Sequence, residues 1–70
     1  MDLKNKKLLT KRELHILALI AEGKTSEKIG KLLFISKTTV QTHRRNMLKK
    51  TGFVNTLQLI AWAYRTKLLK

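Results

Sequence analysis

The chain has 70 residues, and its 16 Lys and Arg against 4 Asp and Glu give a formal net charge of +12 at pH 7. A chain this short forms a single domain, and the absence of cysteine excludes disulfides and thiolate metal sites. Its two histidines are too few and too isolated for a zinc centre, so we expect no metal and no other cofactor. No apolar stretch is long enough to span a membrane, and without an apolar signal segment at the N-terminus we expect a cytoplasmic location.

The excess positive charge is unevenly distributed along the chain. Residues 28–70 contain ten Lys and Arg and no acid, and all four acids lie within residues 2–27. Such a pattern favours a polyanionic partner, since a merely soluble surface normally mixes both signs. Residues 1–8 contain three more lysines and no helix signal, so we expect a flexible basic arm there, ahead of one domain at 9–70.

The first helix signal lies in the segment "LLTKRELHILALIAEG". Thr10 is a good N-cap, and Glu13, three residues later, completes a capping box in which each side chain bonds the other residue's backbone N–H. Gly23 is well placed for the left-handed residue that ends many helices. These signals predict a helix over about 11–22. One side of it carries apolar residues at helical spacing: Ile16, Leu17, Ile20 and Ala21.

A second helix is predicted after a short turn, in "SEKIGKLL". Thr25 can cap it, and Ile29, Leu32 and Leu33 are expected to face inward. Gly30 inside this helix costs about 1 kcal/mol relative to Ala. Because interior glycines usually have a packing reason, we expect Gly30 to allow a close approach of a neighbouring helix.

The third helix, over about 37–51, is predicted to begin after Ser36 as N-cap and to end at Gly52. Its start is unusual, because four β-branched residues, which are poor helix formers, crowd its first six positions. If Val40 faces inward, a rotation of about 100° per residue brings Met47 back to the same side. The opposite side then carries Thr38, Gln41, Thr42, Arg45 and Lys49.

A fourth helix is expected from 56 to about 68, with Asn55 as its N-cap and Gln58 completing the cap. Its segment, "TLQLIAWAYRTKL", contains more apolar residues than one buried stripe needs, and surplus apolar surface on a terminal helix indicates a partner face. No segment shows sustained alternation of polar and apolar residues, as a strand would. The predicted fold is therefore all-α, with four helices joined by short loops.

The second and third helices have the spacing of a helix-turn-helix, since roughly three residues separate them. In that motif the second helix lies in the major groove of DNA, while the first crosses the backbone. Short hydroxyl side chains at positions 38, 39 and 42 would let a helix approach the groove closely, and they offer hydrogen bonds to phosphate or base. The unusual start of the third helix is therefore interpreted as the reading end of a DNA-binding helix.

The segment "LTKRELHILALIAEGKTSEKIGKLLFISKTTVQTHRRNMLKKTG" resembles the DNA-binding domain of the LuxR/FixJ/GerE-type bacterial transcription regulators. The resemblance covers about residues 8–65, and its matches are specific through their order and spacing. Gln41 departs from the family pattern, which often has Lys there; Thr51 replaces the usual Leu, and Gly30 the usual Ala. The matching residues are Leu9, Thr10, Arg12, Glu13, Ala21, Gly23, Thr25, Ile29, Leu33, Ile35, Ser36, Thr39, Val40, His43, Asn46, Lys50 and Gly52.

The resemblance implies that the third helix reads bases and that the fourth supports a homodimer on two DNA half-sites. The implied base readers are Gln41, Thr42 and Arg45. The implied phosphate contacts are Thr25, Ser26, Lys37, Thr38, Thr39, Arg44, Lys49 and Lys50. The implied dimerisation residues are Leu57, Ile60, Ala61 and Tyr64.

We therefore expect a transcription regulator that binds double-stranded DNA, is not an enzyme, and has RNA polymerase as a second candidate partner. A sigma factor's promoter-reading domain shares the helix-turn-helix logic and is the nearest alternative. A basic helical protein bound to a membrane or an acidic partner would also suit the charge, but four capped helices indicate a folded globule. The acids and histidines form no convergent catalytic constellation. The sequence leaves open the target DNA and whether the chain is free-standing or part of a larger regulator.

Overall fold

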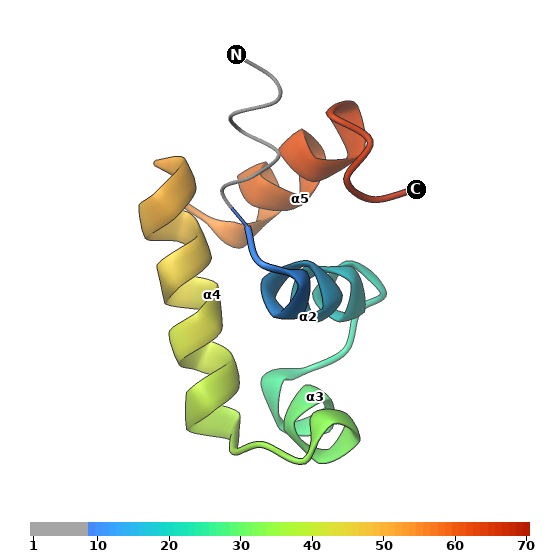
Figure 1. Ribbon diagram of the computed structural model, residues 1–70, viewed down its shortest axis with the longest axis vertical. Coiled ribbons are helices and arrows are strands. Elements are labelled where there is room, and N and C mark those ends of the chain that lie inside the picture. Colours follow the sequence, from blue (N-terminus) through green and yellow to red (C-terminus); the bar gives the residue numbers. More distant parts are fainter. Residues whose placement is uncertain (1–8) are drawn as a thin grey trace.

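The computed structural model describes residues 9–70, and the arm predicted at 1–8 lies outside them. The described residues form four helices, which confirms the all-α prediction: α2 (Lys11–Ala21), α3 (Ser26–Leu33), α4 (Lys37–Thr51) and α5 (Thr56–Arg65). Figure 1 shows α4 running along the long axis of the molecule, with α5, α2 and α3 stacked beside it from top to bottom. The α3–turn–α4 unit is the helix-turn-helix that the sequence predicts.

Each helix begins at the N-cap that the sequence predicts, and each cap side chain accepts a hydrogen bond from the backbone N–H three residues on. At α2 the capping box is complete, since the Thr10 N–H donates to Glu13 Oε1 at 2.9 Å. Gly23 (φ 93°) and Gly52 (φ 78°) take the left-handed conformation expected where α2 and α4 end. The four N-caps are Thr10, Thr25, Ser36 and Asn55.

The last helix ends about one turn earlier than the sequence predicts. The Thr66 hydroxyl donates to the Trp62 carbonyl at 3.0 Å, and Lys67 takes a left-handed φ of 64°. The N–H groups of Leu68 and Leu69 then both donate to the Ala63 carbonyl, at 2.9 and 3.1 Å. This turn folds the chain end back onto the body and buries Leu69, so apolar burial replaces the further helical turn that the local pattern favoured.

The core lies where the four helices meet, and every helix contributes to it. From α4 only Val40 and Met47 are buried, two turns apart on one side, so this helix is held by a narrow stripe. Leu32 was predicted to face inward but is 44% exposed, because α3 turns only Ile29 fully toward the core. The buried apolar side chains are Leu9, Ile16, Leu17, Ile29, Val40, Met47, Leu59, Trp62, Ala63 and Leu69.

The turn between α3 and α4 is tight and packs on Gly30. The Ile35 N–H donates to the Gly30 carbonyl at 2.9 Å, and Phe34 takes a left-handed φ of 59° at the end of α3. A Cβ placed on Gly30 would lie 2.6 Å from the Ile35 carbonyl oxygen, well inside van der Waals contact. Gly30 therefore allows the close approach that the sequence predicts, and the approaching backbone runs from Ile35 in this turn to Lys37, the first residue of α4.

Replacing Gly30 by Val should lower the free energy of unfolding by at least about 2 kcal/mol, because the new side chain must displace the turn backbone. Urea unfolding followed by circular dichroism measures the loss. Lys31→Val is the matched control, since it places the same β-branched residue at an exposed neighbouring position of α3 at a cost of about 0.5 kcal/mol. Equal losses in the two variants would show that the turn has room at Gly30.

Candidate nucleic-acid interface

The outer face of α4 is exposed among residues 9–70. Gln41, Thr42 and Arg45 are all exposed, and within residues 9–70 none of their side chains makes a hydrogen bond or an ion pair. Val40 and Met47, on the opposite side, are fully buried. The predicted orientation of α4 is therefore confirmed, with its polar face available to a partner.

The first turn of α4 is a cluster of hydroxyl groups without an acid. Ser36 Oγ accepts from the Thr39 N–H at 3.0 Å and lies 2.8 Å from Thr39 Oγ1, so the Thr39 hydroxyl is part of the cap. Lys37 and Thr38 are exposed beside it. Because no carboxylate balances the positive end of the helix dipole, this turn is suited to an anion.

The start of α3 has one exposed and one buried residue among the predicted phosphate contacts. Thr25 is exposed, and its hydroxyl caps the helix by accepting from the Lys28 N–H at 3.1 Å. Ser26 is buried, and its hydroxyl lies 3.4 Å from Nη1 of Arg44. Of the two phosphate contacts predicted here, Thr25 lies on the surface and Ser26 lies at the α3–α4 contact.

Arg44 lies in a position that sequence reasoning missed. It is half-buried and points from α4 toward two other helices, donating from Nη1 to Ser26 and from Nη2 to Thr56 Oγ1 at 3.2 Å. Its Nε is buried without a partner among the described residues. The signal was available, because Arg44 stands four residues after Val40 and three before Met47, within the buried stripe of α4.

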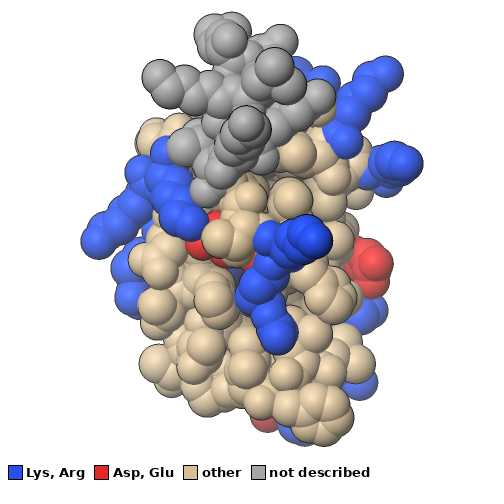
Figure 2. Space-filling view, viewed as in Figure 1, with Lys and Arg blue, Asp and Glu red and all other residues tan. Residues whose placement is uncertain are grey.

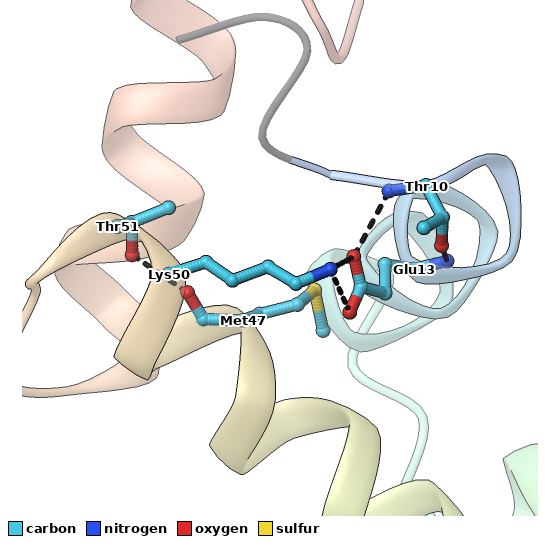
Figure 3. A network of polar contacts seen from close by, with 5 residues as sticks. All are labelled: Thr10, Glu13, Met47, Lys50 and Thr51. Atoms are coloured by element: carbon cyan, nitrogen blue, oxygen red, sulfur yellow. Dashed lines mark hydrogen bonds and ion pairs between the residues drawn. The ribbon is translucent and has the colours of Figure 1, made fainter.

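Lys50 likewise has a partner inside the protein. Its ammonium contacts both carboxylate oxygens of Glu13, at 2.8 and 3.0 Å, and so links the end of α4 to the start of α2 (Figure 3). Burial of Glu13 alone would raise its pKa, but the hydrogen bonds and charge of Lys50 together with the N–H of Thr10 outweigh burial. The pKa of Glu13 is therefore lowered below its ordinary value of 4.5. Lys49, one residue earlier, stays exposed.

Cations project from several sides of the surface. In Figure 2, Lys and Arg side chains extend over the C-terminal half of α4 and over α5, while acids occupy small separate areas. Among the described residues, no helix is long and apolar enough to cross a bilayer. The exposed polar face of α4 therefore lies on a molecule whose surface carries a large excess of positive charge.

A second exposed feature runs along α5. Leu57 and Tyr64 are 76% and 47% exposed, and Ala61 between them is also exposed. Their spacing of four and three residues places them on one side of the helix. Ile60 differs, because it is half-buried and packs against the core. Three of the four predicted dimerisation residues thus form one exposed stripe, to which Ile60 is adjacent.

Comparison with known proteins identifies the kind of domain. The model of a family described as bacterial regulatory proteins, luxR family, matches residues 7–63. The transcriptional regulatory protein LiaR of Bacillus subtilis is 51% identical over 61 residues, which cover 87% of this chain and 29% of LiaR. The oxygen regulatory protein NreC of Staphylococcus aureus is 41% identical over 64 residues, which cover 91% of this chain and 30% of NreC. No solved structure matches significantly. The chain spans less than a third of the length of these relatives.

The Glu13–Lys50 pair should contribute to stability in a way that depends on pH. Glu13→Gln is expected to lower the free energy of unfolding at pH 7 by about 1–2 kcal/mol, because the charged hydrogen bonds from Lys50 are lost. The loss is limited because Lys50 is partly exposed and its ammonium can bind water in their place. Since the folded-state pKa of Glu13 lies below the unfolded value, this contribution is complete above the unfolded-state pKa and is lost as the pH falls through the lower folded-state pKa.

Urea unfolding of the unmodified protein and of Glu13→Gln from pH 7 to pH 3 measures the effect. The free energies of unfolding of the two proteins should converge in acid. Glu22→Gln is the control, because Glu22 is exposed and its 3.3 Å pair with Lys24 is a surface ion pair. Its loss should change stability by less than about 0.5 kcal/mol at any pH. A Glu13→Gln difference that stays constant from pH 7 to 3 would contradict the assignment of the effect to the carboxylate charge.

Proposed function

The chain belongs to the luxR family of bacterial regulatory proteins, and from this premise we propose that it regulates transcription by binding double-stranded DNA with sequence specificity. The observation that carries the proposal is the orientation of α4. Its buried stripe holds the helix to the body, while the three predicted base readers on its other side are exposed and have no partner among residues 9–70. In a helix-turn-helix this is the helix that enters the major groove.

The exposed side chains of α4 suit direct readout of bases. Arg45 can donate two hydrogen bonds to guanine, and Gln41 can pair with adenine through its amide, each contributing about 1–3 kcal/mol of discrimination. Thr42 lies between them and is short enough to let the helix approach, with a methyl group that suits thymine. We assign base reading to these three residues.

Phosphate binding is assigned first to the predicted contacts that are exposed. Lys37, Thr38 and the N-terminal N–H groups of α4 flank the reading face on one side, and Lys49 flanks it on the other. Thr25 offers a further contact at the start of α3. Of the remaining four predicted contacts, Thr39 and Lys50 are also exposed but bond to Ser36 and Glu13, whereas Ser26 and Arg44 bond to each other between helices. Any phosphate contact from these four residues would be shared with those bonds.

The exposed stripe of α5 is proposed as the dimer interface. Two copies that pair through Leu57, Ala61 and Tyr64 would form a two-fold symmetric contact, with the same residues on both sides. The two α4 helices would then meet half-sites about one helical turn, near 10 bp, apart.

LiaR is named a transcriptional regulatory protein, which supports a role in transcription. For such a role we propose RNA polymerase as a second partner and the bacterial cytoplasm as the location. The family match favours this function over the promoter-reading domain of a sigma factor. A helical protein that binds membranes is not favoured, because the family match covers most of the chain.

Arg45→Ala and Lys49→Ala should affect DNA binding in different ways. Arg45→Ala should cost about 1–3 kcal/mol on the selected site and relax the base preference at one position. Lys49→Ala should weaken all sequences alike and reduce the slope of log affinity against log salt by about one. Fluorescence anisotropy with selected and scrambled duplexes over a salt series measures both effects. Equal affinity of the unmodified protein for all duplexes would exclude specific readout.

Leu57→Ser should weaken binding to a duplex with two half-sites at least about tenfold, because it removes apolar contact from the dimer interface. Affinity for a single half-site should change less than about twofold, since Leu57 is exposed in the monomer and the change costs little stability. Leu32→Ser, the same replacement at an exposed position of α3, is the control and should leave both affinities nearly unchanged. A parallel loss on both duplexes would argue against dimerisation through α5.

A further inference from the structure

Arg44 connects three helices through one side chain. Its two terminal nitrogens donate to Ser26, the first residue of α3, and to Thr56, the first residue of α5. Arg44 itself stands in the middle of α4, seven residues before the end of that helix, a distance of about 10 Å along its axis. The start of α5 is therefore held against the middle of α4 as well as through the short loop after Gly52.

Electrostatics does not explain why an arginine stands here. Both acceptors are uncharged hydroxyls at helix N-termini, where the helix dipole disfavours a cation. No carboxylate pairs with Arg44 among the described residues, and its buried Nε lacks a partner. The planar guanidinium of arginine can donate to two acceptors in fixed directions at once, and a lysine ammonium cannot. The advantage of arginine at this position is therefore geometric.

We propose that Arg44 is a positioning residue that fixes the start of α5 against the middle of α4, and that it thereby sets the half-site spacing that the dimer accepts. The inference rests on the proposed function, in which α5 joins the two copies and α4 reads DNA. The loop after Gly52 and the Arg44–Thr56 hydrogen bond both act on the start of α5, so this end of the helix is held against the middle of α4, while the buried face of α5 holds the rest.

The two-fold symmetry of a dimer makes the position of this helix start important. A shift of the start of α5 against α4 occurs in both copies, so the displacement between the two reading helices is doubled. One base pair corresponds to about 3.4 Å along the duplex. A modest loosening of the Arg44–Thr56 contact is therefore enough to let the dimer accept neighbouring spacings, without any change in the residues that touch bases.

The experiment compares two variants that preserve the charge of the protein. Arg44→Lys keeps the cation but lacks the planar fork, and Thr56→Val removes the hydroxyl acceptor while keeping a β-branched side chain. Binding is measured to a single half-site and to duplexes with two half-sites at centre-to-centre spacings from about 8 to about 13 bp, around one helical turn. Urea unfolding confirms that each variant is folded, and Thr56→Val decides the question should Arg44→Lys not fold.

The unmodified protein should prefer one spacing over its neighbours by about tenfold, and both variants should reduce this preference to about threefold or less. Their affinity for a single half-site should stay within about twofold of the unmodified protein. In spacing preference the double variant should resemble either single variant, because both changes break the Arg44–Thr56 hydrogen bond.

Two controls separate positioning from other roles. Lys49→Ala should weaken binding at every spacing alike, as expected for an exposed phosphate contact. Thr66→Val replaces a hydroxyl that bonds only the Trp62 and Ala63 carbonyls of its own segment, and it should leave the spacing preference intact.

The inference would be overturned if Thr56→Val and Arg44→Lys kept the full spacing preference. It would also be overturned if they lost single-site and paired-site affinity in parallel, as a phosphate contact or a general structural role would require. Failure of the proposed function looks different, since the unmodified protein would then bind all duplexes equally or show no preferred spacing.

Discussion

The arrangement of this protein depends on how α4 is anchored. Of the fifteen residues of this helix only Val40 and Met47 are buried, and they lie two turns apart on one side. Apolar burial of side chains of this size contributes about 1.5–3 kcal/mol each, which must hold a helix whose first turns are poor in helix formers. Because the stripe is narrow, nine of the fifteen residues of α4 are exposed among the described residues.

Two polar contacts supplement this stripe, one at the end of α4 and one at its middle. The Glu13–Lys50 ion pair connects the end of α4 to α2, and Arg44 connects its middle to α3 and α5. Both use cations that composition alone would assign to a nucleic-acid surface. The charge of this small domain thus serves two purposes, because some cations hold the helices together and others stay exposed.

The hydroxyl side chains are divided in the same way. Thr10, Thr25 and Ser36 cap helices, while Ser26 and Thr56 accept from Arg44. Thr38 and Thr42 remain exposed on α4. Residues that look alike in the sequence therefore stabilise helix ends, connect helices or face a partner, according to where the fold places them.

Local signals in the sequence determined the helices. Capping residues need only backbone groups three residues away, and helical periodicity needs only one helix, so all four helix starts and the inward side of α4 were predictable. Exposure of Gln41, Thr42 and Arg45 followed from the same periodicity. These features are local, and the tertiary structure did not change them.

Contacts between helices were decided by the tertiary structure alone. Glu13 is 37 residues from Lys50, and Arg44 is 18 residues from Ser26, so no pattern within one helix could pair them. The early end of α5 likewise depends on Leu69 finding the core. The physical reason is the same in each case: burial and side-chain hydrogen bonds between distant residues depend on where the helices pack, while caps and periodicity act within a few residues.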